Sequence, residues 1–343
     1  MNSKELFLKA LNFEPTPRVP VAILGGFTWI IKRDKTSYKN LFNAKDFGVS
    51  HVIKAYNDFG ADNVNAISIV NFFMKYMGGE ICYDKIGENF EVTKPPLKKL
   101  AEIKNYSVDT IMEKALADEE FLAGLKQVAE LKKHYGDEKL IICDSWAPFT
   151  FAGMMVGIQN FLAQILDDEE SAQVAIKFAC ELIERLAEKF IEYGADAFMI
   201  GDPVASGDMI SPGMFEEFAL PSIKMVAEKL DKKNIKYFLH ICGNTIARVE
   251  PLLNSGIDLL SVDSIDLDKA LSICRGNYTL AGDLNPYKVL QIKTPEEVYQ
   301  HCVSRIKKAE LSGGFVLMPG CDLAPNTPLE NIQAMVKAAH DTK

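Results

Sequence analysis

The sequence lacks a long uninterrupted apolar run. No segment reaches the roughly 18 consecutive apolar residues that a membrane-spanning helix requires. Residues 1–5 are mostly polar or charged and do not lead into the apolar segment of a secretory signal peptide. We therefore expect no association with a membrane and a cytoplasmic location.

A surplus of positive charge is also missing. Asp and Glu total 47 against 38 Lys and Arg, which gives a formal charge of -9, and the basic residues do not gather into a stripe. Proteins that bind nucleic acids neutralise phosphates with concentrated Lys and Arg side chains. The composition therefore argues against nucleic acid as a partner.

Cysteine is too sparse and too scattered for a disulfide framework. The chain has seven cysteines, an odd number spread over 343 residues, which favours reduced thiols and leaves room for a metal site. Five of them are interpreted as small buried apolar residues: Cys82, Cys143, Cys180, Cys274 and Cys302. Cys242 and Cys321 differ, because each stands beside a glycine at the end of an apolar run.

Short apolar segments alternate with amphipathic helical segments along the chain. Hydrophobic residues make up 48% of it, enough for a large core. The predicted strands are 19–23, 63–70, 140–144, 197–202, 236–240, 259–263, 279–283 and 315–318. Predicted helices are 3–11, 52–59, 108–134, 159–166, 169–193, 212–230, 245–253, 266–273, 294–311 and 329–339.

Eight buried strands, each followed by a helical segment, predict a (β/α)8 TIM barrel, with an open doubly wound sheet as the alternative. Residues 71–106 break the pattern with glycines and prolines, and we expect an inserted hairpin there, between the second and third strands. No linker divides the chain, so we expect a single domain over 1–343.

Residues that can carry chemistry follow the predicted strands. In a barrel the active site lies at the carboxyl ends of the strands, and those ends hold Asp144, Asp202, His240, Cys242, Asp263, Asp283 and Cys321. Taken singly, His240 or Cys242 is as well explained by a place in the core, and each aspartate by helix capping.

His240 and Cys242 are two positions apart in an extended segment, so their side chains lie on one face. If Cys321 joins them over the barrel mouth, one imidazole and two thiolates form a zinc site with an open position. Two thiolates offset the charge of the ion. Such a site suits holding a substrate thiol as a thiolate better than generating hydroxide, although hydrolysis stays open.

Several motifs resemble those of the uroporphyrinogen decarboxylase superfamily, and within it the methylcobalamin:coenzyme M methyltransferase branch. The resemblance runs along essentially the whole chain, and its markers are residues 147–153 (APFTFAG), 202–206 (DPVAS), 210–212 (ISP), 240–244 (HICGN), 319–322 (PGCD) and 326–331 (NTPLEN). The resemblance implies a barrel and a His-x-Cys…Cys zinc motif, which maps onto His240, Cys242 and Cys321.

This branch implies methyl transfer between a cobalamin on a separate corrinoid protein and a zinc-activated small molecule, first of all a thiol of the coenzyme M type. The alternative direction takes a methyl group from an O-, N-, S- or halo-methyl substrate to cob(I)alamin. The corrinoid protein would dock over the barrel mouth, and a homodimer is left open. Asp202 and Asp263 are the candidate catalytic residues, either one a replaceable fourth ligand; the candidate cofactor contacts are Gly25, Gly26, Asn244 and Asp283.

The sequence departs from the decarboxylase branch after the first predicted strand. Proteins of that branch carry an arginine motif there that grips substrate carboxylates, whereas here residues 23–29 read ILGGFTW and the next arginine is Arg33. Without that cation a porphyrinogen with many carboxylates lacks its main partner. A metal-free decarboxylase-like lyase and a non-enzymatic zinc protein stay as alternatives of other classes.

Overall fold

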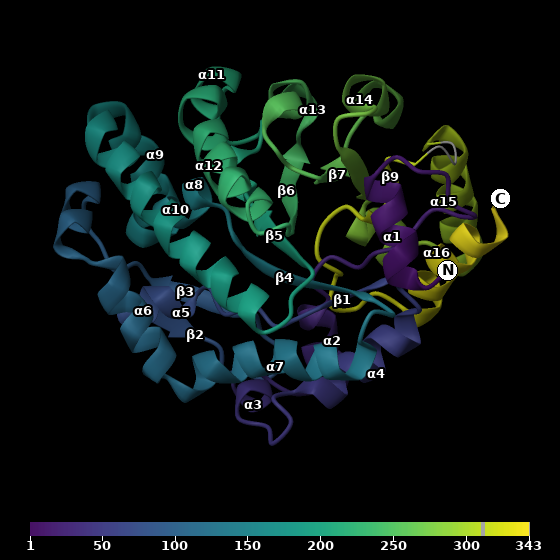
Figure 1. Ribbon diagram of the computed structural model, residues 1–343, viewed down its shortest axis with the longest axis horizontal. Coiled ribbons are helices and arrows are strands. Elements are labelled where there is room, and N and C mark those ends of the chain that lie inside the picture. Colours follow the sequence, from purple (N-terminus) through teal and green to yellow (C-terminus); the bar gives the residue numbers. More distant parts are fainter. Residues whose placement is uncertain (310–312, 343) are drawn as a thin grey trace.

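A computed structural model describes residues 1–309 and 313–342 (Figure 1). Its main sheet has seven strands in sequence order. Every neighbouring pair is parallel, and the helices lie around the outside (Figure 1). The strands are β1 Asn63–Asn65, β4 Leu140–Trp146, β5 Ala197–Gly201, β6 Lys236–Asn244, β7 Leu259–Ser264, β8 Thr279–Leu284 and β9 Phe315–Pro319.

Residues 19–23 close the barrel between β9 and β1. Val21 forms a parallel bridge with Leu317 of β9, and its carbonyl accepts the N–H of Asp62 at 2.8 Å. The prediction of a regular strand here is wrong. Pro20 has no N–H to donate. On the side that faces β1, the side chains of Asp62 and Asn63 accept the N–H groups of Val21 and Ile23 in place of backbone carbonyls. The barrel itself is confirmed, and the open doubly wound sheet is excluded.

Helices follow the strands as expected, with additions. The structure contains α1 Ser3–Leu11, α2 Phe27–Asp34, α3 Tyr38–Phe42, α4 Val49–Phe59, α5 Phe72–Tyr76, α6 Val108–Ala117, α7 Glu119–Tyr135, α8 Pro148–Val156, α9 Ile158–Asp167, α10 Glu169–Glu192, α11 Pro212–Met214, α12 Leu220–Asp231, α13 Ile246–Val249, α14 Leu267–Cys274, α15 Pro295–Ala309 and α16 Leu329–Asp341. Short 3-10 turns occupy Leu100–Asn105, Pro203–Ala205 and Pro251–Asn254, and π-helical turns occupy Phe215–Ala219 and Pro286–Gln291.

Some predicted boundaries are corrected. The helix predicted over 108–134 is two helices, because Asp118 is extended and its side chain accepts the N–H groups of Glu120 and Phe121 as the N-cap of α7. The second strand ends at Asn65, well before residue 70. Helices α2, α3, α5 and α8 were not predicted. The predicted end of the helix over 294–311 lies outside the described residues.

The inserted hairpin is confirmed. Strands β2 (Glu80–Cys82) and β3 (Glu91–Lys94) pair antiparallel between β1 and β4 in the chain. The ring of Phe72 in α5 lies 5.3 Å from that of Tyr83 and 5.1 Å from that of Phe90, between centroids. These edge-to-face contacts hold the hairpin against the barrel, so that Phe90 faces the barrel mouth.

Strand residues alternate between two cores. In β4, Leu140 and Ile142 belong to the core inside the barrel, whereas Ile141 and Cys143 pack against the surrounding helices. Helix α1 closes the amino-terminal end of the inner core, where the ring of Phe7 stacks on Phe238 of β6 with centroids 6.1 Å apart. Toward the carboxyl end, the same inward alternation reaches the polar residues described below.

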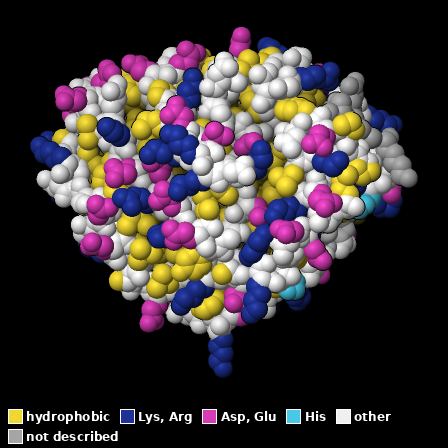
Figure 2. All heavy atoms as spheres, in the orientation of Figure 1, with side chains coloured by type: hydrophobic (Ala, Val, Ile, Leu, Met, Phe, Trp, Pro, Cys, Tyr) yellow, Lys and Arg dark blue, Asp and Glu magenta, His cyan; other side chains and the backbone are white. Residues whose placement is uncertain are grey.

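The surface carries charges of both signs. In the view of Figure 2, Lys and Arg side chains are interspersed with Asp and Glu side chains, and neither sign covers a large area. Within the described residues, no single helix is both long and apolar enough to cross a membrane. Helices α8 and α9 pass that test only as a pair, and they meet at a bend of 100°.

Candidate metal centre at the barrel mouth

Strand β6 presents two of the three candidate ligands. His240 and Cys242 continue the inward alternation that begins with Phe238. His240 pairs in register with Ser261 of β7, and its Nδ1 lies 2.9 Å from the Ser261 hydroxyl oxygen. Because the hydroxyl engages Nδ1, the other ring nitrogen, Nε2, is turned toward Cys242.

Cys321 reaches the same place from β9, which is not adjacent to β6 in the sheet. Gly320 allows the chain after β9 to follow this path. A Cβ atom at Gly320 would lie 2.5 Å from the carbonyl oxygen of Asp263, a distance that only glycine tolerates. The Gly320 N–H also donates to the carbonyl of Leu284 at 2.7 Å. The chain leaving β9 is thereby pressed against the ends of β7 and β8, and the next side chain points across the mouth.

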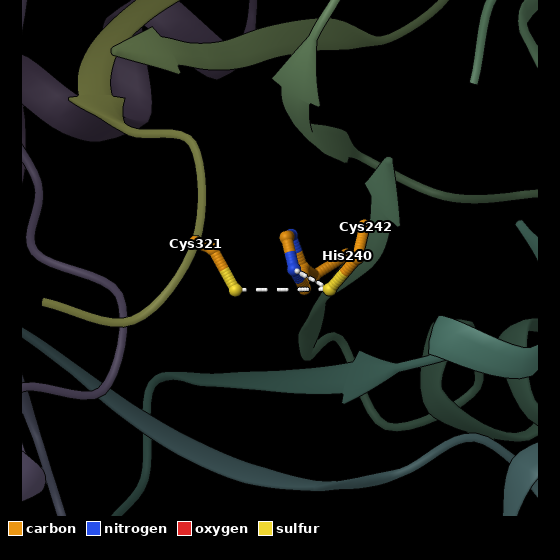
Figure 3. A group of neighbouring side chains, drawn as sticks. All are labelled: His240, Cys242 and Cys321. Carbon is orange, nitrogen blue, oxygen red and sulfur yellow. Dashed lines mark hydrogen bonds between the residues drawn. The ribbon is translucent and has the colours of Figure 1, made fainter. Parts of the chain in front are cut away.

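The three side chains point toward one another (Figure 3). His240 Nε2 lies 3.1 Å from Cys242 Sγ, and the two sulfurs of Cys242 and Cys321 are 3.7 Å apart. All three donor atoms lie within 4.8 Å of one another. Two sulfurs at about 2.3 Å from a tetrahedral zinc are separated by about 3.8 Å, so the donor set and its spacing fit this ion.

The pKa values of the two thiols are shifted in opposite directions. Hydrogen bonds from Cys242 and His240 lower the pKa of Cys321. The same pairing with Cys321, together with burial, raises the pKa of Cys242. One sulfur is therefore ready to ionise, and a bound dication would deprotonate the other as well.

A cavity of about 330 Å³ opens beside the cluster. Its walls combine apolar and aromatic side chains with a few polar ones, and among the described residues none of them is Lys or Arg. The lining residues are Leu24, Gly25, Phe27, Tyr38, Ser68, Asn71, Phe90, Asp144, Ser145, Trp146, Met199, Gly201, Pro203, His240, Cys242, Cys321 and Asp322.

The two predicted glycines surround Asp322. The N–H of Gly26 donates to Asp322 Oδ1 at 2.6 Å, and the hydroxyl of Thr28 donates to Oδ2 at 3.0 Å. Gly25 has a φ of +63°, and a Cβ atom there would lie 2.6 Å from Asp322 Oδ1. Burial nevertheless raises the pKa of Asp322 to about 6. Gly25 and Gly26 thus make room for a carboxylate in the cavity wall.

The predicted catalytic aspartates occupy different places. Asp263 follows the inward alternation of β7, and burial together with the charge of Cys321 raises its pKa. Asp202 is fully buried, accepts the hydroxyl of Thr150 in α8 at 2.6 Å, and does not line the cavity. Burial raises the pKa of Asp202 to about 7.

The remaining two predicted contacts lie away from the cavity. Asp283 forms a salt bridge of 3.1 Å with Arg305 of α15. Asn244 is exposed at the end of β6, where its N–H donates to Asp208 at 2.9 Å. The structure therefore gathers His240, Cys242 and Cys321 around one point, but leaves Asp283 and Asn244 outside that group.

Sequence reasoning missed three contributors. Ser261 orients His240. In the sequence, Ser261 is marked only by its inward-facing position in its strand. That it faces His240 becomes known only from the register between β6 and β7. Asp322 directly follows Cys321, but it was given no role. The aromatic walls come from the unpredicted helices α2 and α3 and from the inserted hairpin, so no local motif marks them.

Several known proteins are similar to this chain. A methylated-thiol–coenzyme M methyltransferase of Methanosarcina mazei is 30% identical over 218 residues, which are 64% of this chain but only 58% of that protein. A methylcobamide:CoM methyltransferase, MtbA, of the same organism is 31% identical over 244 residues, 71% of this chain and 68% of that protein.

A solved structure described as a methyltransferase from Methanosarcina mazei superposes with a TM-score of 0.88 at 23% identity, covering 99% of each chain, and this likeness concerns the fold. The uroporphyrinogen decarboxylase (URO-D) family matches residues 2–342. The barrel, the motifs and this match together show that the chain belongs to the uroporphyrinogen decarboxylase family.

Proposed function

We propose that the protein is a zinc-dependent methyltransferase that moves a methyl group between a corrinoid, carried by a partner protein, and a small-molecule thiol. The observation that carries the proposal is the cluster of His240, Cys242 and Cys321 on the wall of a largely apolar cavity. The two relatives from Methanosarcina mazei, whose names describe methyl transfers involving coenzyme M, support the same reaction class.

The donor set favours a thiol substrate. Zinc held by one imidazole and two thiolates would bind a third sulfur and keep it ionised near neutral pH. Ser261 fixes the orientation of His240 by engaging Nδ1. Leu24, Met199 and the aromatic residues give the cavity beside the cluster a mostly apolar lining, and a sulfur anion bound there would be poorly solvated and therefore nucleophilic.

The reaction requires few groups from the protein. The thiol loses its proton to solvent on binding, and a sulfur lone pair then forms the new S–CH3 bond. A methylated corrinoid on the partner protein would supply the methyl group, and the electron pair of its cobalt–carbon bond would remain on the corrinoid. The cluster and the cavity wall position the sulfur, and the partner protein presents the methyl group from the open mouth.

The residues that line the cavity argue against the decarboxylation of a porphyrinogen. A substrate with several carboxylates needs cationic partners, yet no Lys or Arg among the described residues lines this cavity, and Asp144 and Asp322 do line it. Arg33, the first arginine after the first predicted strand, pairs with Asp34 instead.

A methyl-transfer assay tests the proposal. Protein purified in a buffer that contains zinc is mixed with methylcobalamin and a small thiol, and the decrease in methylcobalamin absorbance is followed. We expect transfer that a chelator abolishes and that added zinc restores. Full transfer after complete removal of the metal would contradict the assignment. The substitution Cys82→Ala serves as control, because Cys82 lies in the inserted hairpin away from the cluster.

A further inference from the structure

The cavity beside the cluster holds negative charge without a positive counterpart. Asp144 and Asp322 line it, and none of its described lining residues is Lys or Arg. Zinc with two thiolates is neutral, and a bound substrate thiolate adds one negative charge. An anionic group on the substrate would add another. Charges of one sign in a poorly solvated space repel one another strongly, so this cavity favours an occupant that carries a positive charge.

Aromatic rings form one wall of the same cavity. The Tyr38 ring stands between those of Phe27 and Phe90, with centroid distances of 6.3 Å and 5.6 Å. Trp146 Nε1 donates to the side-chain oxygen of Asn71 at 2.8 Å, and the Asn71 amide donates to the carbonyl of Phe90 at 2.9 Å. The indole and the hairpin are thereby held in place. Faces of aromatic rings attract cations through their quadrupole.

The carboxylates lie close to this aromatic wall. Asp144 and Asp322 line the same cavity as Tyr38, Phe90 and Trp146, and Asp144 lies two residues before Trp146 on β4, so their side chains lie on the same face of the strand. Asp322 is satisfied by Gly26 and Thr28. Asp144 is less well satisfied, since its Oδ1 is buried and has no hydrogen-bond partner among the described residues. Carboxylates next to aromatic faces are the combination that recognises ammonium groups.

We propose that the thiol which this protein methylates carries a positively charged group, an ammonium or quaternary ammonium, that lies against Asp144 and the wall of Tyr38, Phe90 and Trp146. This inference rests on the proposed function and narrows its substrate class. Coenzyme M, which the relatives name, is 2-mercaptoethanesulfonate and carries the opposite charge at the corresponding end.

Three thiols of equal length test the charge preference. 2-Aminoethanethiol is cationic, 2-mercaptoethanol is neutral and 2-mercaptoethanesulfonate is anionic. Transfer rates from methylcobalamin are divided by the uncatalysed rates of the same thiols, and binding to the zinc-loaded protein is measured separately by calorimetry. We expect kcat/KM and affinity to fall in that order, by about tenfold or more at each step.

Single substitutions test which residues cause the preference for a cationic thiol. Asp144→Asn should lower the cationic-to-neutral ratio of kcat/KM and of Kd about tenfold, and Phe90→Leu on a separate element should lower it several-fold. Asp208→Asn removes one exposed charge at the same end of the barrel, outside the cavity, and should leave the ratio unchanged.

Two results would overturn the inference alone: a preference for the sulfonate in an otherwise active enzyme, or an Asp144→Asn variant whose ratio equals that of the parent. Transfer to none of the three thiols, with no heat of binding, would overturn the proposed function and this inference together.

Discussion

The two ends of the barrel treat buried carboxylates in opposite ways. At the amino-terminal end, an aspartate directly precedes each of three alternate strands: Asp62 before β1, Asp196 before β5 and Asp258 before β7. Each one accepts a backbone N–H from the neighbouring strand segment, of Val21, Ile141 and Tyr237 respectively. Each is also paired with a cation.

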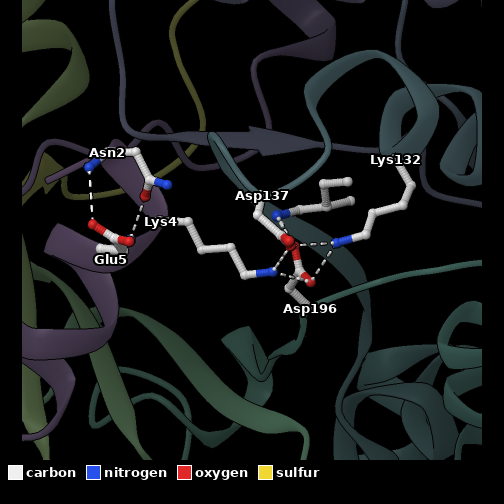
Figure 4. A network of polar contacts seen from close by, with 7 residues as sticks. Asn2, Lys4, Glu5, Lys132, Asp137 and Asp196 are labelled. Carbon is white, nitrogen blue, oxygen red and sulfur yellow. Dashed lines mark hydrogen bonds and ion pairs between the residues drawn. The ribbon is translucent and has the colours of Figure 1, made fainter.

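The cations come from distant parts of the chain. Arg18 engages both oxygens of Asp62 at 2.7 Å, and Lys236 lies 2.7 Å from Asp258. Lys4 of α1 and Lys132 of α7 both reach Asp196, at 2.9 Å and 3.3 Å, and share Asp137 (Figure 4). This end therefore fastens helices and strands together.

The carboxyl-terminal end leaves its aspartates incomplete. Asp144, Asp202 and Asp263 each keep one buried oxygen without a hydrogen-bond partner among the described residues, and burial raises the pKa of all three. Native proteins rarely leave buried polar atoms unpaired. The comparison teaches that these carboxylates are paired at the amino-terminal end, whereas oxygens stay unpaired at the carboxyl-terminal end, where the active site of a barrel lies.

The largest expected effect is a loss of zinc affinity, and it concerns only the carboxyl-terminal end of the barrel. Cys321→Ala removes one of three ligands. Zinc sites contribute about 10–16 kcal/mol over four ligands, so losing one ligand, about 2.5–4 kcal/mol, should weaken zinc binding roughly 100- to 1,000-fold. Zinc content after dialysis measures this, with Cys82→Ala as the matched cysteine control. Full zinc occupancy in the Cys321 variant would refute the ligand assignment.

Breaking the amino-terminal end should affect folding instead. Asp62→Ala leaves Arg18 without its partner and removes the acceptor for the Val21 N–H at the barrel closure. Loss of one partner of a buried pair costs about 3–5 kcal/mol. Urea unfolding measures it, while zinc stoichiometry should stay unchanged. Asp137→Ala removes an exposed member of the network in Figure 4 and should change stability little; equal losses in both variants would contradict the comparison.

Asp202 provides a pH test of the incomplete end. Burial raises its pKa from an ordinary 3.8 to about 7, so the folded state prefers the protonated form. Stability should therefore fall as pH rises from about 4 to 7 and then level off. Asp202→Asn cannot ionise, and it should gain on the order of 2–4 kcal/mol over the parent between pH 4 and pH 8.

Thermal and urea unfolding of the Asp202 variant and its parent across this range measure the difference. The side-chain oxygen of the introduced Asn would still accept the hydrogen bond from the Thr150 hydroxyl, so the two proteins differ mainly in the ability of residue 202 to ionise. Parallel pH profiles for the two proteins would show that Asp202 is not the group that titrates.

The smallest of these effects concerns the orientation of one ligand. Ser261→Ala removes the partner of His240 Nδ1 without touching the donor atoms. Loss of such a partner typically lowers metal affinity about 10–100-fold. Competition with a chelator of known zinc affinity measures this. Ser261→Thr keeps a hydroxyl on the same strand position and should recover part of the loss, whereas equal affinities for Ala and Thr would exclude the proposed orienting role.

The sequence by itself determined the barrel, the inserted hairpin and the family motifs. Strand alternation and the His240–Cys242 spacing are local properties, because side chains two apart on a strand share a face. The same local pattern placed aspartates at the strand ends, but the roles predicted for Asp202, Asp263 and Asp283 depend on contacts that a local pattern does not contain.

Only the tertiary structure decided which of these residues meet. The closure through Val21 depends on the side chains of Asp62 and Asn63, and the approach of Cys321 depends on Gly320 fitting against the backbone of Asp263. Ser261 becomes visible only through the β6–β7 register. The charge and shape of the cavity arise from segments far apart along the chain, and contacts of that kind leave no periodic signal in a sequence.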